Sequence, residues 1–160
     1  MNLKEELGLD QAIETMEHEC LLNILYTATM LYKASYLYFR QYGITDAQFN
    51  VLIQLRYAKQ QGLSQADLGR RLVVNKADMT GIIDRLEKAG LAGREDHPKD
   101  RRVNIIKITR KGRDIVNKLE PSYFKGVKKL MSGMPKSDMK TIMKGMEQIR
   151  ENVRQEELAG

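Results

Sequence analysis

Apolar residues recur every three or four positions along most of the chain, which predicts a mainly helical protein. A first long helix is expected from about Asp10 to Gln41, where the apolar positions form a broad face. Gly43 is expected to end it, and Thr45 with Gln48 has the pattern of a capping box that begins a second helix. The long helix alone would expose much apolar surface, so we expect a partner subunit to cover it.

Two short helices joined by a tight turn are expected next. Ser64 is placed to cap a helix that runs to Leu72, and Asn75 to cap one that runs to Ala89. A helix pair of this size is typical of a helix-turn-helix, although such pairs are common in other proteins. The second helix has helical spacing of the apolar residues Met79, Ile82, Ile83 and Leu86, which we expect to face the core.

After Gly90 the apolar period changes from helical to alternating. The residues Leu91–Glu95 and Val103–Ile108 read as two short strands around a charged turn. Thr109 then caps a helix that runs towards Pro121, and a last helix follows a break at Gly133. A helix pair followed by a charged hairpin is the order of elements in a winged helix-turn-helix. The fold class predicted is therefore mainly α with a small β-hairpin wing.

Positive charge is concentrated in the middle of the chain. The net charge is +6, and the segment from Gly62 to Arg113 carries 13 basic and 7 acidic residues, an excess that equals the whole net charge. Such a local field is typical of a protein that binds a polyanion, and a solvated basic face is the competing interpretation. Together with the hairpin, the charge favours double-stranded DNA as the partner.

The second helix of the pair is the candidate recognition helix, which would enter the major groove. Its outward positions are small or polar and lie mostly near its N-terminus, which permits close approach to base edges. We expect Lys76 to contact phosphate or guanine, and Thr80 to contact phosphate or a thymine methyl group. The candidate DNA-binding residues on this helix are Asn75, Lys76, Ala77, Thr80, Gly81 and Asp84. The competing interpretation is an ordinary amphipathic helix with a solvated outer face.

The hairpin supplies a second set of candidate DNA-binding residues: Lys99, Asp100, Arg101 and Arg102. Arginine suits a narrow minor groove, where the electrostatic potential is most negative. Asp100 is expected to orient a neighbouring guanidinium by a charge-assisted hydrogen bond. Exposed hairpins are also charged simply for solubility, which is the alternative here.

Other classes of function find little support in the sequence. The histidines His18 and His97 lie outside any pattern of nucleophile, paired carboxylates or metal ligands, so we expect no enzyme, no metal site and no cofactor. The single Cys20 excludes a disulfide within the chain and fits a reducing compartment. No apolar stretch suits a membrane span or a signal peptide, so a cytoplasmic protein is expected.

Three stretches together resemble the MarR family (multiple antibiotic resistance regulators): GITDAQFNVLIQL, GLSQADLGRRLVVNKADMTGIIDRLEKAGLAGRE and HPKDRRVNIIKITRKGRDI. The resemblance runs from about Gly43 to Ile115. It implies a helical dimerisation region formed by residues 1–43 and 116–160, and a winged helix-turn-helix DNA-binding domain over residues 44–115. It also implies a homodimer with intertwined first and last helices, whose two heads read a pseudo-palindromic operator.

The resemblance extends to individual residues, with two departures. It implies that Asp100 and Arg102 form the family's wing pair, with the arginine in the minor groove. Gly69 stands where the family usually has alanine, and Gly81 stands where many members carry arginine. The second departure removes a possible DNA contact, so the operator sequence cannot be taken from relatives.

The resemblance also implies a small-molecule effector. Family members often respond to aromatic or phenolic ligands, which implies a repressor released by such a compound. Tyr26, Tyr36 and Tyr38 lie in the right segment for a pocket, while aromatic residues at helical spacing are also typical of core or interface.

Two alternative functions remain open. Cys20 suggests a thiol-based peroxide sensor, because one branch of the family uses a first-helix cysteine near tyrosines. Tyr26 is poorly placed to share a helix face with Cys20. The position of Cys20 on the apolar stripe predicts a buried, inert thiol. The other alternative is a winged-helix module that binds proteins, which the departure at Gly81 favours and the charged hairpin disfavours.

Overall fold

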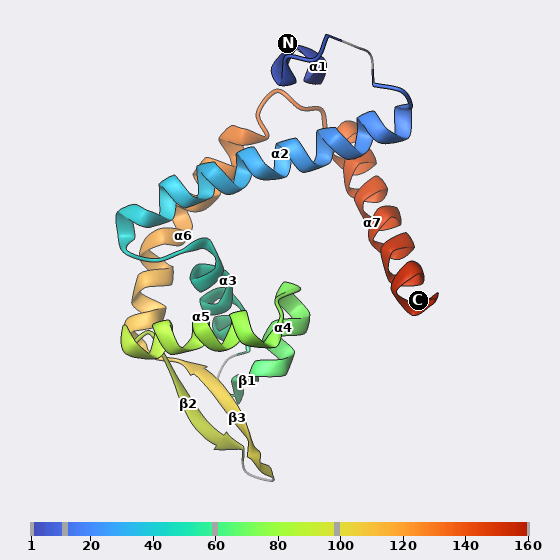
Figure 1. Cartoon of the computed structure of the whole chain (residues 1–160). Helices are drawn as coiled ribbons and strands as arrows, with labels where there is room; N and C mark the ends of the chain where they lie inside the picture. The colour runs from blue at the N-terminus through green and yellow to red at the C-terminus, as the bar shows by residue number, and fades with distance from the viewer. Residues whose placement is uncertain (1, 11–12, 59–60, 98–99, 160) are drawn as a thin grey trace. The chain divides into compact units, whose positions relative to one another are not determined.

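The computed structural model describes residues 2–10, 13–58, 61–97 and 100–159, and for residues 100–102 and 157–159 it describes the backbone alone. The chain divides into two compact units, Met1–Val116 and Asn117–Gly160 (Figure 1). The elements in chain order are α1 (Leu3–Leu7), α2 (Met16–Phe39), the 3-10 helix η1 (Arg40–Tyr42), α3 (Asp46–Tyr57), β1 (Leu63–Ser64), α4 (Gln65–Leu72), α5 (Lys76–Lys88), β2 (Ala92–His97), β3 (Asp100–Ile108), α6 (Arg110–Leu130) and α7 (Lys136–Ala159).

The predicted fold class, mainly α with a small β-hairpin wing, is confirmed. Each predicted cap also forms. Thr45 and Gln48 make the reciprocal hydrogen bonds of a capping box at the start of α3. The side chain of Ser64 accepts from the backbone N–H of Asp67 at the start of α4. The side chain of Asn75 accepts from the backbone N–H of Asp78 at the start of α5. Because these caps satisfy backbone donors that the first helical turn leaves unpaired, short sequence signals placed these helix starts correctly.

Two boundaries differ from the prediction. The long helix begins at Met16 rather than near Asp10, because Thr15 caps it by accepting from the N–H of His18 at 3.2 Å. The last helix before the break runs through Pro121 instead of stopping near it. A proline within a helix removes one hydrogen bond and favours a kink, which disfavours a continuous helix without forbidding it.

The core of the winged region (residues 44–115) forms where α3, α4 and α5 pack on the small sheet. The predicted inward face of α5 is confirmed, since Met79, Ile83 and Leu86 are fully buried and Ile82 nearly so. Burial of each such side chain contributes about 1.5–3 kcal/mol to folding. The other buried apolar residues of this region are Ile44, Phe49, Val51, Leu52, Leu55, Leu63, Leu68, Leu91, Ala92, Ile106 and Ile108.

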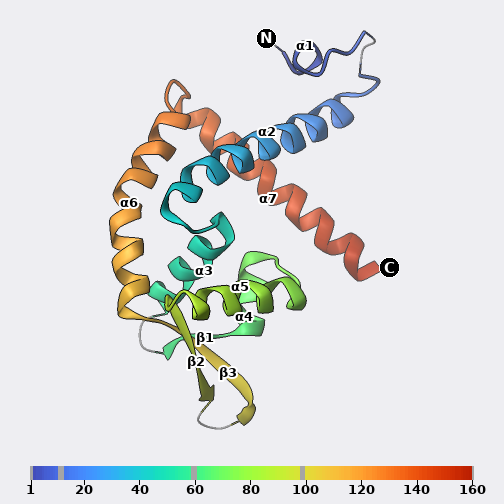
Figure 2. The same cartoon turned by 60° about the vertical axis from the view of Figure 1, so that its left-hand side comes forward.

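The sheet has three antiparallel strands in the order β1-β3-β2. The short strand β1, which the sequence did not predict, pairs Leu63 with Ile106 and leads directly into α4. Hairpin β2–β3 extends beyond α4 and α5 in both views (Figures 1 and 2), with an irregular register between Asp96 and His97. The hairpin is longer than predicted, because the charged residues around the turn also pair as strands.

The motif Thr109-Arg110-Lys111-Gly112 fastens the end of α5 to the start of α6. The Thr109 hydroxyl donates to the carbonyl of Gly90, and the Lys111 ammonium donates to the carbonyl of Ala89, both at 2.8 Å. A Cβ at Gly112 would lie 2.1 Å from the carbonyl oxygen of Leu91, so only glycine permits this close approach. The start of α6 is thereby fixed to the C-terminal end of α5.

The long helices expose apolar side chains. In α2 only Phe39 is buried, where its ring lies 4.7 Å from that of Phe49 on α3. Exposed apolar residues of α2 include Met16, Leu21, Leu25, Met30, Leu31, Tyr32, Tyr36 and Leu37, and those of α7 include Ile142, Met143, Ile149 and Val153.

Candidate nucleic-acid interface

Asn75, the first candidate residue of the candidate recognition helix α5, is the N-cap of that helix. The Oδ1 atom of Asn75 accepts from the backbone N–H of Asp78 at 2.9 Å, and its Nδ2 donates to the Asp78 carboxylate at 2.7 Å. Both polar atoms of this exposed side chain are therefore engaged. We interpret Asn75 as a residue that forms the helix N-terminus rather than one whose amide is free for base reading.

Thr80 is held by a residue that sequence reasoning missed. The Nε2 atom of Gln65, at the start of α4, donates to the Thr80 Oγ1 at 2.6 Å and to the Lys76 carbonyl at 3.3 Å. The Thr80 hydroxyl in turn donates to the same carbonyl at 2.8 Å. Since its only hydrogen is used within the helix, Thr80 has no hydrogen to donate to a phosphate, and its methyl group is left for a contact with DNA.

Asp84 is tied to the wing. The guanidinium of Arg94 on β2 forms ion pairs with Glu87 and with Asp84, the latter at 2.6 Å. The backbone N–H of Arg94 also donates to the Glu87 carboxylate at 2.9 Å. Because Arg94 joins the base of the hairpin to the second half of α5, we interpret Asp84 as a residue that positions the wing. The spacing of the chain carries no signal for this contact, which depends on how the strand crosses the helix.

The rest of the outward face of α5 is open. Lys76 and Ala77 are exposed and Gly81 is half-buried. No described residue forms a hydrogen bond or ion pair with the Lys76 ammonium, whose charge stays available at the helix N-terminus. A small surface with a free cation at a helix N-terminus suits the close approach of an anionic polymer.

The wing candidates lie at the start of β3. The backbone of Asp100, Arg101 and Arg102 belongs to this strand, and Asp100 is in register with His97. Lys99 lies outside the described residues. Because the hairpin projects beyond the helices (Figure 1), this part of β3 is well separated from the core of the winged region.

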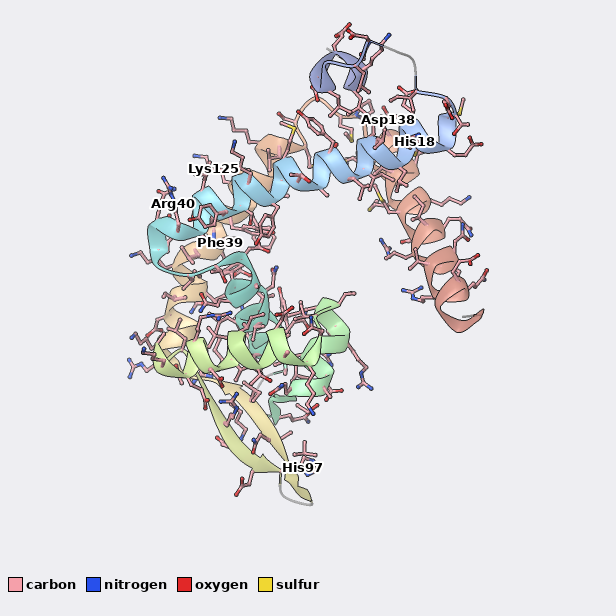
Figure 3. All side chains as sticks on the ribbon, viewed as in Figure 1. His18, Phe39, Arg40, His97, Lys125 and Asp138 are labelled. Atoms are coloured by element: carbon pink, nitrogen blue, oxygen red, sulfur yellow. The ribbon has the colours of Figure 1, made fainter. Side chains whose placement is uncertain are left out.

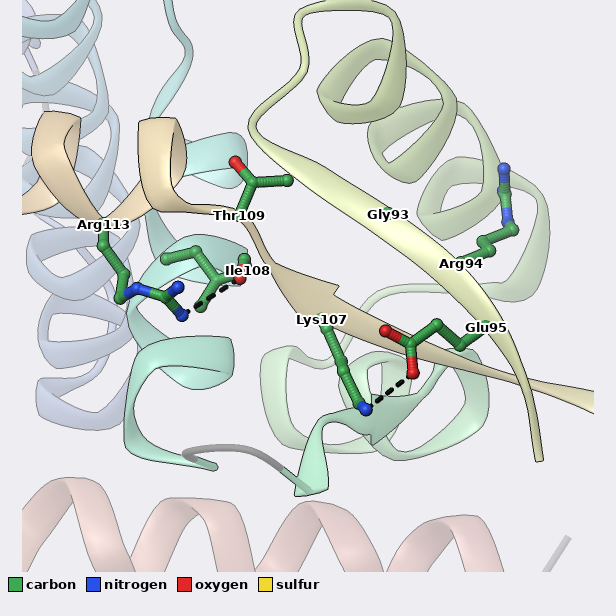
Figure 4. A pocket seen from close by; sticks show the side chains of 7 residues that line it. All are labelled: Gly93, Arg94, Glu95, Lys107, Ile108, Thr109 and Arg113. Carbon is green, nitrogen blue, oxygen red and sulfur yellow. Dashed lines mark hydrogen bonds and ion pairs between the residues drawn. The ribbon is translucent and has the colours of Figure 1, made fainter. Parts of the chain in front are cut away.

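A hollow of about 440 Å³ lies at the base of the wing, lined by Gly93, Arg94, Glu95, Lys107, Ile108, Thr109 and Arg113 (Figure 4). Its charged groups all have partners, and those of Arg94 are Glu87 and Asp84 on α5. Lys107 contacts Glu95 at 2.6 Å, and the Arg113 guanidinium donates to the carbonyl of Ile108 at 3.2 Å. The hollow contains none of the tyrosines proposed for a ligand pocket.

Those tyrosines are spread along α2. The ring of Tyr38 contacts the rings of Phe39 and Tyr42, at centroid distances of 4.9 and 5.5 Å. Tyr26 and Tyr36 are ten residues apart in one helix, which corresponds to a rise of about 15 Å. The single chain therefore does not gather the three candidates into one small pocket, and their ligand role stays a prediction.

Cys20 is exposed in the single chain, so the prediction of a buried thiol is wrong for the chain by itself. Its position on the apolar stripe of α2 did not bury it, because none of the described residues of the first unit covers that part of the helix. The thiol is accessible to oxidants from this face.

Other kinds of site find no support in the described part of the chain. His18 and His97 lie far apart, on α2 and near the hairpin tip (Figure 3). Within the described ranges, no group of three or more His, Cys, Asp or Glu residues is arranged to hold a metal ion. None of the helices described there is both long and apolar enough to cross a membrane.

One carboxyl group in the helix pair has a shifted pKa. The hydrogen bond from the Ser64 hydroxyl, at 2.7 Å, and the ion pair with Arg70 lower the pKa of Asp67 below its ordinary value of 3.8, against a smaller opposing effect of burial. The shift belongs to the cap of α4 and therefore to stability rather than to DNA contact.

Comparison with known proteins agrees with this geometry. The model of the MarR family matches residues 42–103. The HTH-type transcriptional repressor YetL of Bacillus subtilis is 32% identical over 94 residues, which is 59% of this chain and 56% of the repressor's own length. The chain thus matches little more than half of that relative.

Two solved structures share the fold. The MepR–DNA complex of S. aureus has a TM-score of 0.75 at 19% identity, and the match covers 81% of this chain and 94% of that one. CouR from Rhodococcus jostii RHA1, bound to p-coumaroyl-CoA, has a TM-score of 0.73 at 19% identity, with 86% and 95% covered. The family model on residues 42–103, the similarity to YetL and the shared fold together support a MarR family regulator.

Proposed function

We propose that the chain is a sequence-specific DNA-binding transcriptional regulator. The observation that carries the proposal is the recognition helix: Gln65 fixes its outward face, Arg94 fixes the wing to it, and its small outward residues allow close approach. YetL is named a transcriptional repressor, and MepR has been solved on DNA. In this proposal α5 enters the major groove and the start of β3, with Arg102, reaches the minor groove.

The DNA upstream of the protein's own gene supplies a probe. Duplex fragments that tile this region are titrated with the full chain, and fluorescence anisotropy measures the affinity. Arg102→Ala should weaken binding by about 1–3 kcal/mol. Arg150→Ala, which removes an exposed arginine of α7, is the matched control for loss of one positive charge. Equal effects of the two variants would refute the wing assignment, and absence of binding to duplex DNA would refute the proposed function.

We propose a homodimer as the active form. The exposed apolar residues of α2 and α7 support this, because a second copy would remove them from water and would space two heads along a pseudo-palindrome. Light scattering after size-exclusion chromatography should give twice the mass of the chain. Replacing Leu25 on α2 by glutamate should shift the protein to a monomer, and a wild-type monomer at micromolar concentration would contradict the dimer.

The regulator is proposed to be a repressor that a small aromatic or phenolic ligand releases from DNA. CouR, which shares the fold, has been solved with p-coumaroyl-CoA. A ligand acts in this way only if it binds one spacing of the two heads better than the other. Phenolic acids titrated into the protein–DNA complex should lower the anisotropy, and Tyr26→Ala or Tyr36→Ala should reduce that response. A ligand response that both variants retain in full would exclude the proposed tyrosines.

Exposure of Cys20 favours a second candidate signal, oxidation by peroxide. Mass spectrometry after peroxide treatment, together with the affinity for DNA, tests it. A modified thiol with lost DNA binding, both abolished by Cys20→Ser, would support the redox signal. Unchanged DNA binding after complete oxidation would exclude it.

A further inference from the structure

The outward face of α5 contains a pair of residues one turn apart, Gly81 and Arg85. A Cβ built at Gly81 would lie 3.5, 3.7 and 3.9 Å from the Nη1, Nη2 and Cζ atoms of Arg85. All three guanidinium atoms are therefore within van der Waals distance of the place where a side chain at position 81 would start. The glycine leaves a space on the helix, and the arginine one turn later lies in it.

Helix geometry explains this placement. Side chains in an α-helix lean towards its N-terminus, so a long side chain covers the turn that precedes its own Cα atom. A side chain longer than alanine at position 81 would occupy the same surface as the Arg85 guanidinium. The two positions therefore compete for one place on the outward face of α5, and glycine at 81 gives that place to Arg85.

The charge of Arg85 is not neutralised. No described residue forms a hydrogen bond or ion pair with its guanidinium, and the residue is exposed. Its acidic neighbour Asp84 is bound to Arg94, and Asp78 is bound to the amide of Asn75. By contrast, Arg70 and Arg94 in the same region both form ion pairs with acids. The outward face of α5 thus presents an unpaired planar cation beside two small residues, Ala77 and Gly81.

We infer that Arg85 is a specificity-determining residue that reads a base edge in the major groove from the place over Gly81. The guanidinium fork donates two parallel hydrogen bonds, which match the O6 and N7 acceptors of guanine. Because Gly81 has no side chain, the backbone of α5 can approach the DNA closely at this position. The Arg85 guanidinium then lies between this part of the helix and the base edges. This inference rests on the proposed DNA binding and adds the residue that supplies the missing contact at position 81.

The full chain is first used to select duplexes from a random DNA library, and the affinities of variants are then measured on the selected duplex and on each of its single base-pair changes. Arg85→Ala should bind the selected duplex about 5- to 100-fold more weakly and lose its preference at one G·C position in each half-site. Arg85→Lys, which keeps the charge without the fork, should not restore that preference. Lys88→Ala, an exposed cation of the same helix, removes the same charge and should keep it.

The possible results distinguish a failure of the proposed function from a failure of the proposed role of Arg85. If the wild-type chain enriches no sequence, the proposed function fails. If it enriches a sequence and Arg85→Ala prefers the same bases, the role of Arg85 is overturned. A uniform loss of affinity with a salt slope smaller by about 0.9 would show a phosphate contact and would also overturn base reading. Circular dichroism confirms that each variant is folded.

Discussion

Apolar residues recur at helical spacing in both the winged region and the long helices α2 and α7, but they are buried in the first and largely exposed in the second. In the winged region the apolar faces of α3, α4, α5 and the sheet are buried against one another, so this region has a core of its own. In α2 only the last residue, Phe39, is buried, and the described side chains of α7 between Lys136 and Glu156 are at most half-buried. Periodicity predicts a helix in both regions, but it does not tell which partner covers the apolar face.

This difference supports the separate tasks that we propose for the two regions, DNA binding and dimerisation. A region with its own core can hold Gln65, Arg94 and the caps of α4 and α5 at fixed positions, which reading of DNA requires. Helices with uncovered apolar faces are suited to association, which reading of two half-sites requires. Substitutions in the winged region should therefore lower the free energy of unfolding at any protein concentration. For substitutions in the long helices the effect should depend on protein concentration.

The largest effect is expected for Ile83→Ala in the core of the winged region. Loss of this fully buried side chain should lower the free energy of unfolding by about 2–5 kcal/mol, because it leaves a cavity. Ile142→Ala is the same change on α7, where the side chain is 45% exposed in the single chain. Its effect should depend on protein concentration, because it acts through association. Denaturant titrations at two concentrations test both, and a cost below about 1 kcal/mol for Ile83→Ala would contradict a self-contained core.

The next effect is expected for Gly112→Ala at the start of α6. The added Cβ would meet the Leu91 carbonyl at 2.1 Å, so the junction between α5 and α6 must shift, at a cost of about 1–3 kcal/mol or more. Gly126→Ala in the same helix meets nothing within 4 Å and should gain up to about 1 kcal/mol from helix propensity. The melting temperatures of the two variants are compared. Equal shifts in melting temperature would show that the close packing of Gly112 on Leu91 does not stabilise the junction between α5 and α6.

A smaller effect of opposite sign is expected for Val73→Gly in the turn between α4 and α5. Val73 is 93% exposed and has φ of 53°, a left-handed conformation that disfavours β-branched residues. Relief of about 1–2 kcal/mol exceeds the entropic cost of glycine, which leaves a net gain of about 0.5–1 kcal/mol. Val74→Gly, at a half-buried position without positive φ, should instead destabilise. Destabilisation by both changes would disprove the strain.

The smallest effect concerns acid. The pKa of Asp67 is lowered in the folded chain, so its contribution to stability is complete above the ordinary value of 3.8 and is lost as pH falls through the folded value. Asp67→Asn should therefore reduce the loss of stability as the pH falls below 3.8. Denaturation midpoints across this range measure it. An identical acid profile in the variant would assign the acid sensitivity to other groups.

Local signals carried most of the fold prediction. Thr45, Ser64 and Asn75 marked helix starts correctly because a cap depends on only three or four neighbouring residues. Strand β1 escaped prediction because two residues, Leu63 and Ser64, pair with a strand some forty residues later. The end of the helix was wrongly predicted at Pro121. A proline inside a helix lacks one backbone N–H donor, which disfavours the helix, but α6 continues through it.

The candidate site was predicted only in outline. The outward face of α5 follows from its period, since the inward residues Met79 to Leu86 leave the others outside. The roles of its members do not, because Asp84 and Thr80 are held by Arg94 and Gln65 from other elements. Arg85 was overlooked because the role we propose for it depends on the position of its side chain over Gly81, which sequence spacing does not reveal.

The central claim is that the winged region binds duplex DNA through its cations, and the salt dependence of affinity tests it most directly. The affinity of the full chain for its selected duplex is measured by anisotropy between about 50 and 300 mM salt. Each neutralised phosphate contributes about −0.9 to the slope of log K against log salt concentration, so we expect a slope of about −3 or steeper. A slope near zero, or no measurable binding at the lowest salt, would contradict the account.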